Sequence, residues 1–272
     1  MSKIYYKTVR RNLKSWHGNL QYEVGKEISL PVVKEPQLCT NTVLHASETP
    51  LDALQYASAL DCALLEVSGD EVIHGEDKSS GFYSLSVIRE IPDSEKDSMY
   101  GFSYNEAIHP IDPCEITSEL MERDKENLKQ WAYVNDSVWA YASDLFYGSV
   151  EPFSSSVRTM VMNSVNDSII ESLSNSILSS FRISFSGALS KSICNSVGDS
   201  ISDSFWAYVS SLFPTMGRYV YIARLDNTKV KYPFQSGVEL WKRGFIPIRL
   251  NNKWNLYHPI KGKSAKLVWK GF

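Results

Sequence analysis

The stretch "NDSIIESLSNSILSSFRISFSGALSKSICNSVGDSISDSF", residues 166–205, decides how the middle of the chain folds, because an apolar residue returns at every fourth position. The full series is Val157, Val161, Val165, Ile169, Leu173, Ile177, Phe181, Phe185, Leu189, Ile193, Val197, Ile201, Phe205, Val209 and Phe213. An α-helix turns about 100° per residue, so a four-residue repeat drifts about 40° per unit. One long straight helix therefore cannot keep this stripe against a core.

Two structures accommodate the repeat. A β-solenoid fits the strict period, the absence of proline between Pro152 and Pro214, and the high content of serine, which is a mediocre helix former. Two or three shorter packed helices, with breaks near Gly187 and Gly198, are the alternative. We expect the solenoid, and the helical alternative stays open.

The repeat is bounded by a duplicated element. "DSVWAYASDLF" at 136–146 and "DSFWAYVSSLF" at 203–213 are identical at eight of eleven positions. In a solenoid these copies would cover the open ends. The first copy also reads as a short helix that ends at Gly148.

Residues 1–112 predict an α/β module. Strands are expected at 41–47, 63–69 and 82–91, with a helix that starts after Thr49, where Pro50 occupies the first turn. A connector helix is expected over 113–134, opening at Asp112 and Pro113.

Residues 214–272 predict a small antiparallel unit of short strands, at 217–226, in 232–250 and on both sides of an Asn251–Asn252 turn. The fold class is therefore α+β. Its four segments are the α/β module 1–112, the connector 113–134, the repeat 135–213 and the β-rich module 214–272.

Composition places the chain among soluble proteins. The net charge of −3 hides an asymmetry, because residues 214–272 hold 12 Lys or Arg against Asp226 and Glu239, which leaves −13 for the remainder. The start of the chain lacks the apolar core of a secretory signal, and no apolar run is long enough to span a membrane. Four widely spaced cysteines without CxxC spacing point to reduced thiols rather than a metal site or disulfides. We expect a cytoplasmic protein.

Two stretches carry a family resemblance. "YEVGKEISL" (22–30), "LCTNTVLHASETPLDALQYA" (38–57) and "LEVSGDEVIHGEDKSSGFYSLSVIREI" (65–91) resemble a phage-associated domain of unknown function. The chain departs from that family at Val43 and Leu44, where glycine and phenylalanine usually precede the histidine. The repeat and the segment 233–269 are similar to uncharacterised phage-type proteins with Asp-Ser-Val-x arrays. The resemblance implies a phage or prophage accessory protein and no particular activity.

No phosphate loop, dinucleotide-binding glycine motif, HExxH or GxSxG is present. The segment "LHASETPLDALQYA" (44–57) resembles the strand and helix of ADP-ribosyltransferase-like folds, which hold NAD in a cleft. Its candidate residues are His45, Ser47 and Tyr56, with Glu66 on the next strand to orient a ribose. The alternative reading is a histidine satisfied within a sheet and a serine that starts the following helix.

The basic C-terminal segment interleaves cations with aromatic rings, a mixture that attracts phosphate by charge and stacks on bases. The candidates for binding an anionic partner are Lys242, Arg243, Arg249, Lys253, Lys263, Lys266, Trp241 and Trp254. The same charge also suits an acidic protein surface, including a second copy of this chain.

These features predict a protein that binds or scaffolds without catalysis, cofactor or metal. Its partner would be a protein, itself or a nucleic acid, and no membrane. The alternative is an NAD-using transferase with its cleft in the first module.

Overall fold

The computed structural model describes the backbone of residues 3–75, 79–149, 169, 171–179, 188–212, 232 and 234–271. Side chains are described over the same residues except 136–149, 188–193 and 210. The chain divides into two compact units, of which the first runs to Ile108 and the second begins at His109. Helices and strands occur in both, so the predicted α+β class is confirmed.

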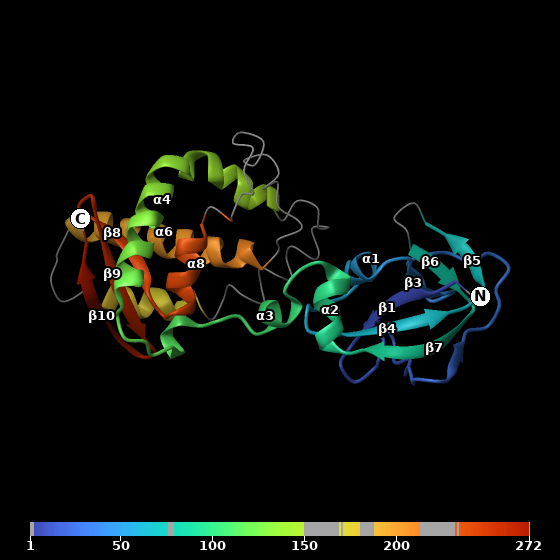
Figure 1. Ribbon diagram of the computed structural model, residues 1–272. Helices are drawn as coiled ribbons and strands as arrows, with labels where there is room; N and C mark the ends of the chain where they lie inside the picture. Colours follow the sequence, from blue (N-terminus) through green and yellow to red (C-terminus); the bar gives the residue numbers. More distant parts are fainter. Residues whose placement is uncertain are drawn as a thin grey trace. The chain divides into compact units, whose positions relative to one another are not determined.

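The first unit is built on a seven-stranded sheet (Figure 1). Its strands are β1 (Tyr5–Val9), β2 (Glu27–Ser29), β3 (Leu44–Ser47), β4 (Ala63–Ser68), β5 (Glu71–His74), β6 (Ser79–Phe82) and β7 (Ser84–Ile91). Their order is β2-β7-β4-β1-β3-β6-β5, and every pair is antiparallel. The helices are α1 (Pro50–Leu54), α2 (Asp93–Tyr100) and α3 (Tyr104–Ile108).

The strand, helix, strand sequence expected from the residues is present as β3, α1 and β4. Thr49 caps α1 by accepting a hydrogen bond from the Asp52 backbone N–H, and Pro50 lies in the first turn, as predicted. The two strands are not neighbours, because β1 lies between them and pairs antiparallel with both.

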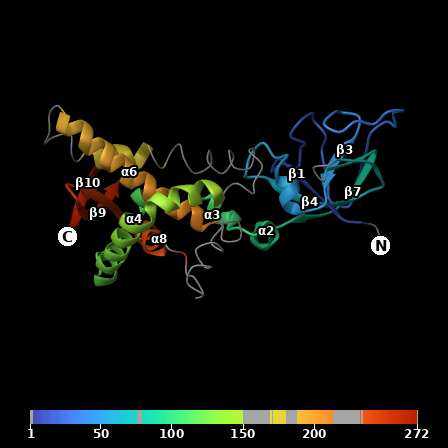
Figure 2. The same ribbon diagram turned by 90° about the horizontal axis from the view of Figure 1, so that it is seen from above.

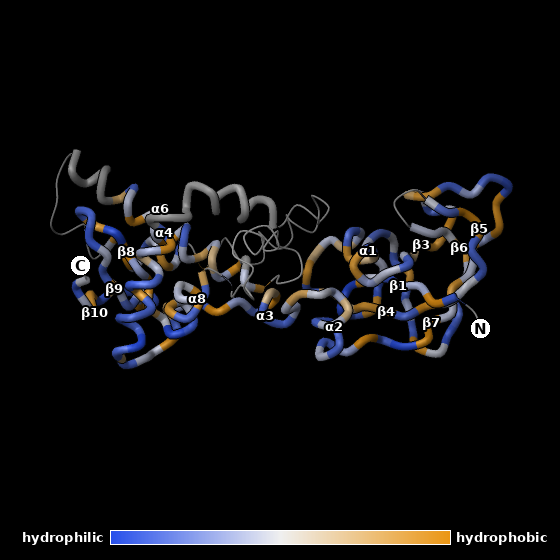
Figure 3. The backbone as a smooth tube through the Cα atoms, turned by 45° about the horizontal axis from the view of Figure 1, so that its top comes forward, coloured by the Kyte–Doolittle hydropathy of each residue, from blue (hydrophilic) through white to orange (hydrophobic). Residues whose placement is uncertain are grey.

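The core of this unit follows from the alternation of its strands. Tyr5, Val9, Leu65, Val67 and Phe82 are buried together, and hydrophobic stretches run along β1 and β4 in Figure 3. At about 25 cal/mol per Å² of apolar surface, each such side chain stabilises the sheet by about 1.5–3 kcal/mol.

The second unit packs helices against a three-stranded antiparallel sheet of order β10-β9-β8. Its elements are η1 (Pro113–Glu115), α4 (Glu122–Ser149), α6 (Ala188–Ser211), α8 (Gln235–Lys242), β8 (Ile246–Leu250), β9 (Lys253–Ile260) and β10 (Lys263–Lys270), with a further helical stretch at 171–179. Both α6 and α8 contact β8, and α4 contacts β9 (Figures 1 and 2).

The expectation of a β-solenoid is wrong in every part of the repeat that the structure describes, where the backbone is α-helical. Val197, Ile201 and Phe205 are at most 1% exposed although the stripe turns along α6. The apolar stripe rotates around α6 from one repeat unit to the next, and it stays buried because successive units pack against different neighbouring elements. Near Ser200 the helix contacts β8, whereas Phe205 lies 6.0 Å, centroid to centroid, from the ring of Trp241 on α8. The repeat positions Val157, Val161, Val165, Phe181, Phe185 and Phe213 lie outside the described residues.

The serines of the repeat have a specific use in α6. β8 is an edge strand, so the backbone groups of Arg249 that point away from β9 need partners. Ser200 Oγ accepts the Arg249 N–H at 3.1 Å, and Ser196 Oγ donates to the Arg249 carbonyl at 2.5 Å. A hydroxyl at every fourth position therefore covers the strand edge.

Two further expectations are corrected. The connector helix does not begin at Asp112, whose carboxylate instead caps the 3₁₀ turn η1, and α4 starts at Glu122. The segment before β8 is helix α8 rather than strand. A Cβ at Gly237 would come within 2.3 Å of the Trp131 ring, so glycine permits this helix to approach α4.

The hairpin between β8 and β9 is confirmed. Asn251 and Asn252 have φ angles of 51° and 60°, the left-handed conformation that a two-residue turn requires and that asparagine tolerates. The strand expected at 217–226 lies outside the described residues.

Candidate functional site

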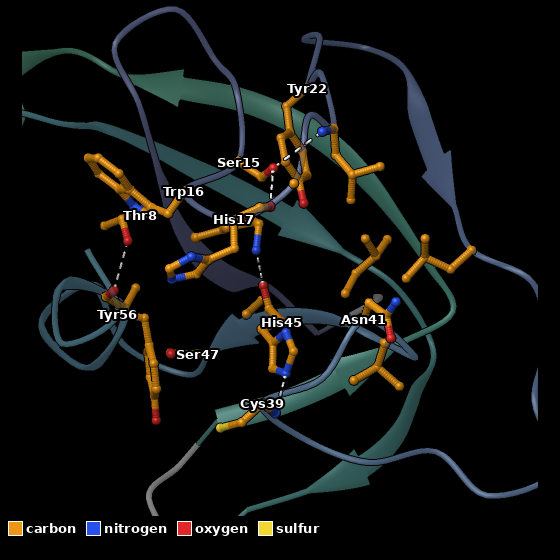
Figure 4. Close-up of a pocket in the computed structure, with 18 of the residues that line it drawn as sticks. Thr8, Ser15, Trp16, His17, Tyr22, Cys39, Asn41, His45, Ser47 and Tyr56 are labelled. Atoms are coloured by element: carbon orange, nitrogen blue, oxygen red, sulfur yellow. Dashed lines mark hydrogen bonds between the residues drawn. The ribbon is translucent and has the colours of Figure 1, made fainter. Parts of the chain in front are cut away.

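A cleft of about 740 Å³ opens beside β1 and β3 in the first unit (Figure 4). These two strands share a single registered pair, Tyr6 with Ser47. Beyond this pair the two strands separate, and the residues that would continue the ladder line the cleft instead: Lys7 and Thr8, which follow Tyr6 in β1, and Leu44 to Ala46, which precede Ser47 in β3.

Lys7 connects β1 to β3 where the two strands separate. Its Nζ donates a hydrogen bond of 2.6 Å to the His45 carbonyl and lies 5.4 Å from the centre of the Tyr22 ring. Burial without a counter-charge lowers the pKa of Lys7 to about 8. Lys7 was not among the candidates expected from the sequence, although a lysine inside the largely buried strand "YYKTV" is a usable signal.

His45 is held in one tautomer. Its Nε2 accepts the backbone N–H of Cys39 at 2.8 Å, so in the neutral ring the proton resides on Nδ1. This bond ties the loop before β3 to the strand, and Cys39 itself has a positive φ of 59°.

Aromatic side chains make up much of the remaining wall, from Tyr6, Trp16, His17, Tyr22 and Tyr56. Figure 4 shows Trp16 and Tyr56 on the same side of the cleft, away from Asn41. The indole N–H of Trp16 is buried and has no hydrogen-bond partner among the described residues.

Three of the four residues selected for an NAD cleft meet here, namely His45, Ser47 and Tyr56. Glu66 does not line the cleft. Its two carboxylate oxygens accept from Nε and Nη2 of Arg89 at 2.8 and 3.0 Å. No Asp or Glu occurs among the described residues of the cleft wall, and Lys7 is its only lysine.

The aromatic residues proposed for an anionic partner in the second unit have structural roles. Trp241 is fully buried, its indole N–H donates to the Ile111 carbonyl at 3.0 Å, and its ring stacks on Tyr208. Trp254 is 3% exposed and packs edge-on against Trp131. Neither ring is available for stacking on a base.

Arg243 also has a structural role, because its guanidinium forms an ion pair of 2.6 Å with Asp124, a carboxylate with no exposed surface. Lys242, Lys253, Lys263 and Lys266 are exposed, and Arg249 is half-buried. Lys266 is registered opposite His258, and Lys270 is registered opposite Asn255. His258 and Asn255 are three residues apart on β9 and so point to opposite faces of the sheet, which means that the lysines of β10 do not form one continuous patch.

The N-terminal part of the chain is recognisable by comparison with protein families. Residues 3–96 match a family described as a domain of unknown function (DUF7666), and all the residues that line the cleft fall inside this match. Comparison with curated proteins and with solved structures gives no match.

The described residues contain no group of three or more His, Cys, Asp or Glu placed to hold a metal ion. None of the helices in the described part of the chain has the length and apolar character needed to cross a membrane.

Proposed function

We propose that the protein is an accessory protein of phage type that acts by binding, and that the cleft of its first unit holds a small anionic ligand with an aromatic ring. One observation carries this proposal. The cleft combines a lysine, two histidines and several aromatic rings with no carboxylate in its described wall. The phage association rests on the sequence resemblance alone.

The ligand class follows from this wall. The charge of Lys7 favours an anionic group, and the exposed ring of Tyr56 offers a face for stacking. A nucleotide has both an anionic group and a flat ring. NAD, the ligand implied by the transferase-like segment, belongs to the same class.

Binding without group transfer is the better supported form of this proposal. A transferase would use a carboxylate beside the ribose, and the carboxylate selected for that task, Glu66, is engaged by Arg89 away from the cleft wall. The NAD-using transferase therefore stays an alternative, and no carboxylate in the described cleft wall is available to orient the ribose.

Calorimetric titration of the full chain with NAD, AMP and adenosine tests the proposal. We expect NAD and AMP to bind, and adenosine to bind about tenfold more weakly because it has no charge to pair with Lys7. The affinity for AMP should fall as the pH rises through about 8, since Lys7 then loses its proton.

Lys7→Met should bring the affinity for AMP close to that for adenosine. The matched control is Lys26→Met, because Lys26 is exposed, pairs with Glu23 and lies outside the cleft. Absence of binding by all three compounds, or equal effects of the two substitutions, would contradict the proposal.

A second mode of binding, through the basic C-terminal segment, stays a prediction. Residues 240–271 contain no Asp or Glu, and their basic residues are Lys242, Arg243, Arg249, Lys253, Lys261, Lys263, Lys266 and Lys270. With Trp241 and Trp254 buried, attraction to a nucleic acid or to an acidic protein surface would rest on charge.

A further inference from the structure

Two lysines of the first unit donate hydrogen bonds to backbone carbonyls, and their other partners differ. Lys96 has no exposed side-chain surface and pairs with the Asp93 carboxylate at 2.7 Å, with a second bond to the Cys62 carbonyl. Lys7 has its hydrogen bond to the His45 carbonyl and its contact with the Tyr22 ring, and no carboxylate within ion-pair distance among the described residues. The two amines are therefore chemically unequal.

A carbonyl and an aromatic ring stabilise an ammonium group less than a carboxylate does. The pKa of Lys7 is accordingly lowered to about 8 by burial. At pH 8 about half of Lys7 is then the neutral amine, whereas an ordinary lysine with a pKa near 10.4 is less than about 1% neutral. A neutral amine has the free electron pair that nucleophilic attack requires.

The position of the amine suits attack on a bound molecule. Lys7 lines the cleft, and its bond to His45 occupies one N–H, which the neutral amine retains. The bond fixes Nζ at the split between β1 and β3 and leaves its electron pair for a ligand in the cleft.

We propose that Lys7 is a nucleophilic amine that condenses reversibly with an aldehyde group on a small anionic ligand held in the cleft. Nζ attacks the carbonyl carbon, a proton moves from nitrogen to oxygen, and the resulting hydroxyl leaves with a second proton as water while the C=N bond forms. No oxidation or reduction takes place. The proposal rests on the proposed function, because the ligand must first occupy the cleft.

Pyridoxal 5′-phosphate is a suitable probe because it combines an aldehyde, an aromatic ring and a phosphate. The full chain is treated at pH 8 with a limiting amount of the probe and with cyanoborohydride, which reduces the imine to a stable amine, and the modified lysines are mapped by peptide mass spectrometry. We expect Lys7 to react about tenfold faster than Lys26, since its larger neutral fraction outweighs its lower basicity. Equal labelling of the two lysines would overturn the proposal.

Lys7→Arg should abolish the fast labelling and the absorbance of the imine, while Lys26→Arg should leave both unchanged. Arginine keeps a donor for the His45 carbonyl, and thermal unfolding checks that the variant folds. Persistence of the fast phase in Lys7→Arg would assign the reactive amine elsewhere and refute the proposal.

Pyridoxine 5′-phosphate, which has an alcohol in place of the aldehyde, separates this inference from the proposed function. If it binds the cleft and protects Lys7 from the probe, the binding function and the assignment of the reactive amine both stand. If it binds while the aldehyde labels Lys7 no faster than Lys26, the cleft binds such ligands and the imine chemistry is refuted. If it does not bind and Lys7 labels slowly, both proposals fail.

Discussion

Asp203 on α6 is an acid whose environment disfavours its charge. Burial raises the pKa of Asp203 to about 7, an effect opposed by the hydrogen bond from Asn135 Nδ2 at 3.1 Å and increased by the negative charge of Asp199. The protonated form is therefore favoured in the folded state at mildly acidic pH.

The sign of the resulting pH dependence follows from proton linkage. Between pH 4 and pH 7 the folded state retains a proton that the unfolded state has lost, so the free energy of unfolding should fall as pH rises across this window. We expect a loss of about 2 kcal/mol, allowing for partial exposure of the side chain. Above pH 7 the contribution is constant.

Asp203→Asn should remove this loss and leave the protein more stable than the wild type at pH 8. Urea unfolding followed by tryptophan fluorescence at pH 5 and pH 8 measures both quantities. Glu171→Gln, at an exposed position, serves as control and should retain the wild-type pH profile. A wild-type profile that is flat between the two values would contradict the argument.

Single residues were predictable where their own chemistry decides their position. Thr49 and Pro50 start α1 because capping is local, and His45, Ser47 and Tyr56 share a cleft because a strand and the helix after it are adjacent in space. Trp241 was misjudged because only the tertiary structure places it between Tyr208 and the Ile111 carbonyl. Composition cannot distinguish such a buried ring from a stacking surface.

At the scale of elements, the hydrogen bond between Ser200 on α6 and the Arg249 N–H at the edge of β8 can be tested by substitution. Ser200 accepts the Arg249 N–H and donates to the Ser196 carbonyl. Ser200→Ala would leave a strand N–H without a partner and should lower the free energy of unfolding by about 1–2 kcal/mol.

The matched control is Ser202→Ala in the same helix, because no hydrogen bond of the Ser202 side chain is described. Alanine has the higher helix propensity, so this change should be neutral or slightly stabilising, within about 0.5 kcal/mol. Both variants are compared with the wild type by urea unfolding. Equal stabilities would show that the hydroxyl of Ser200 contributes nothing to the edge.

The elements were predictable to different degrees for physical reasons. The Asn251–Asn252 hairpin depends on two residues that tolerate positive φ, so the sequence predicts it. α8 was missed because Ser236, Gly237 and Val238 are poor helix formers whose conformation is imposed by packing against Trp131. The repeat was assigned to a solenoid because a helical stripe was assumed to face a single core. In the structure α6 contacts β8, α8 and α4, so a stripe that rotates around the helix can stay buried.

At the scale of the whole molecule, each unit has its own hydrophobic cluster. The cluster of the first unit draws its buried members from between Tyr5 and Val87, and that of the second from between Leu128 and Leu256. Neither cluster shares a residue with the other, so each unit buries its core with its own elements.

We expect residues 1–108 expressed alone to fold with a cooperative thermal transition. Their amide NMR resonances should overlay those of the same residues in the full chain, and AMP should shift the resonances of Lys7 and His45 in both. A fragment with the narrow amide dispersion of an unfolded chain would contradict the independence of this unit.

The repeated serines also give α6 more than one way to lie along β8. A slide by one unit moves the helix about 6 Å and rotates it about 40°, and it replaces Ser196 and Ser200 at Arg249 by Ser200 and Ser204, which are chemically identical. The repeat alone therefore leaves the alignment degenerate.

Residues that break the repeat remove this degeneracy. Tyr208 accepts the Ile111 N–H at 2.9 Å and stacks on Trp241, and Asp203 accepts from Asn135, contacts that exist in one alignment only. The regularly spaced serines can hydrogen-bond the strand edge in every alignment, and a few irregular side chains select one alignment. Substitutions at Tyr208 would therefore change the alignment of α6 along β8 rather than separate the helix from the strand.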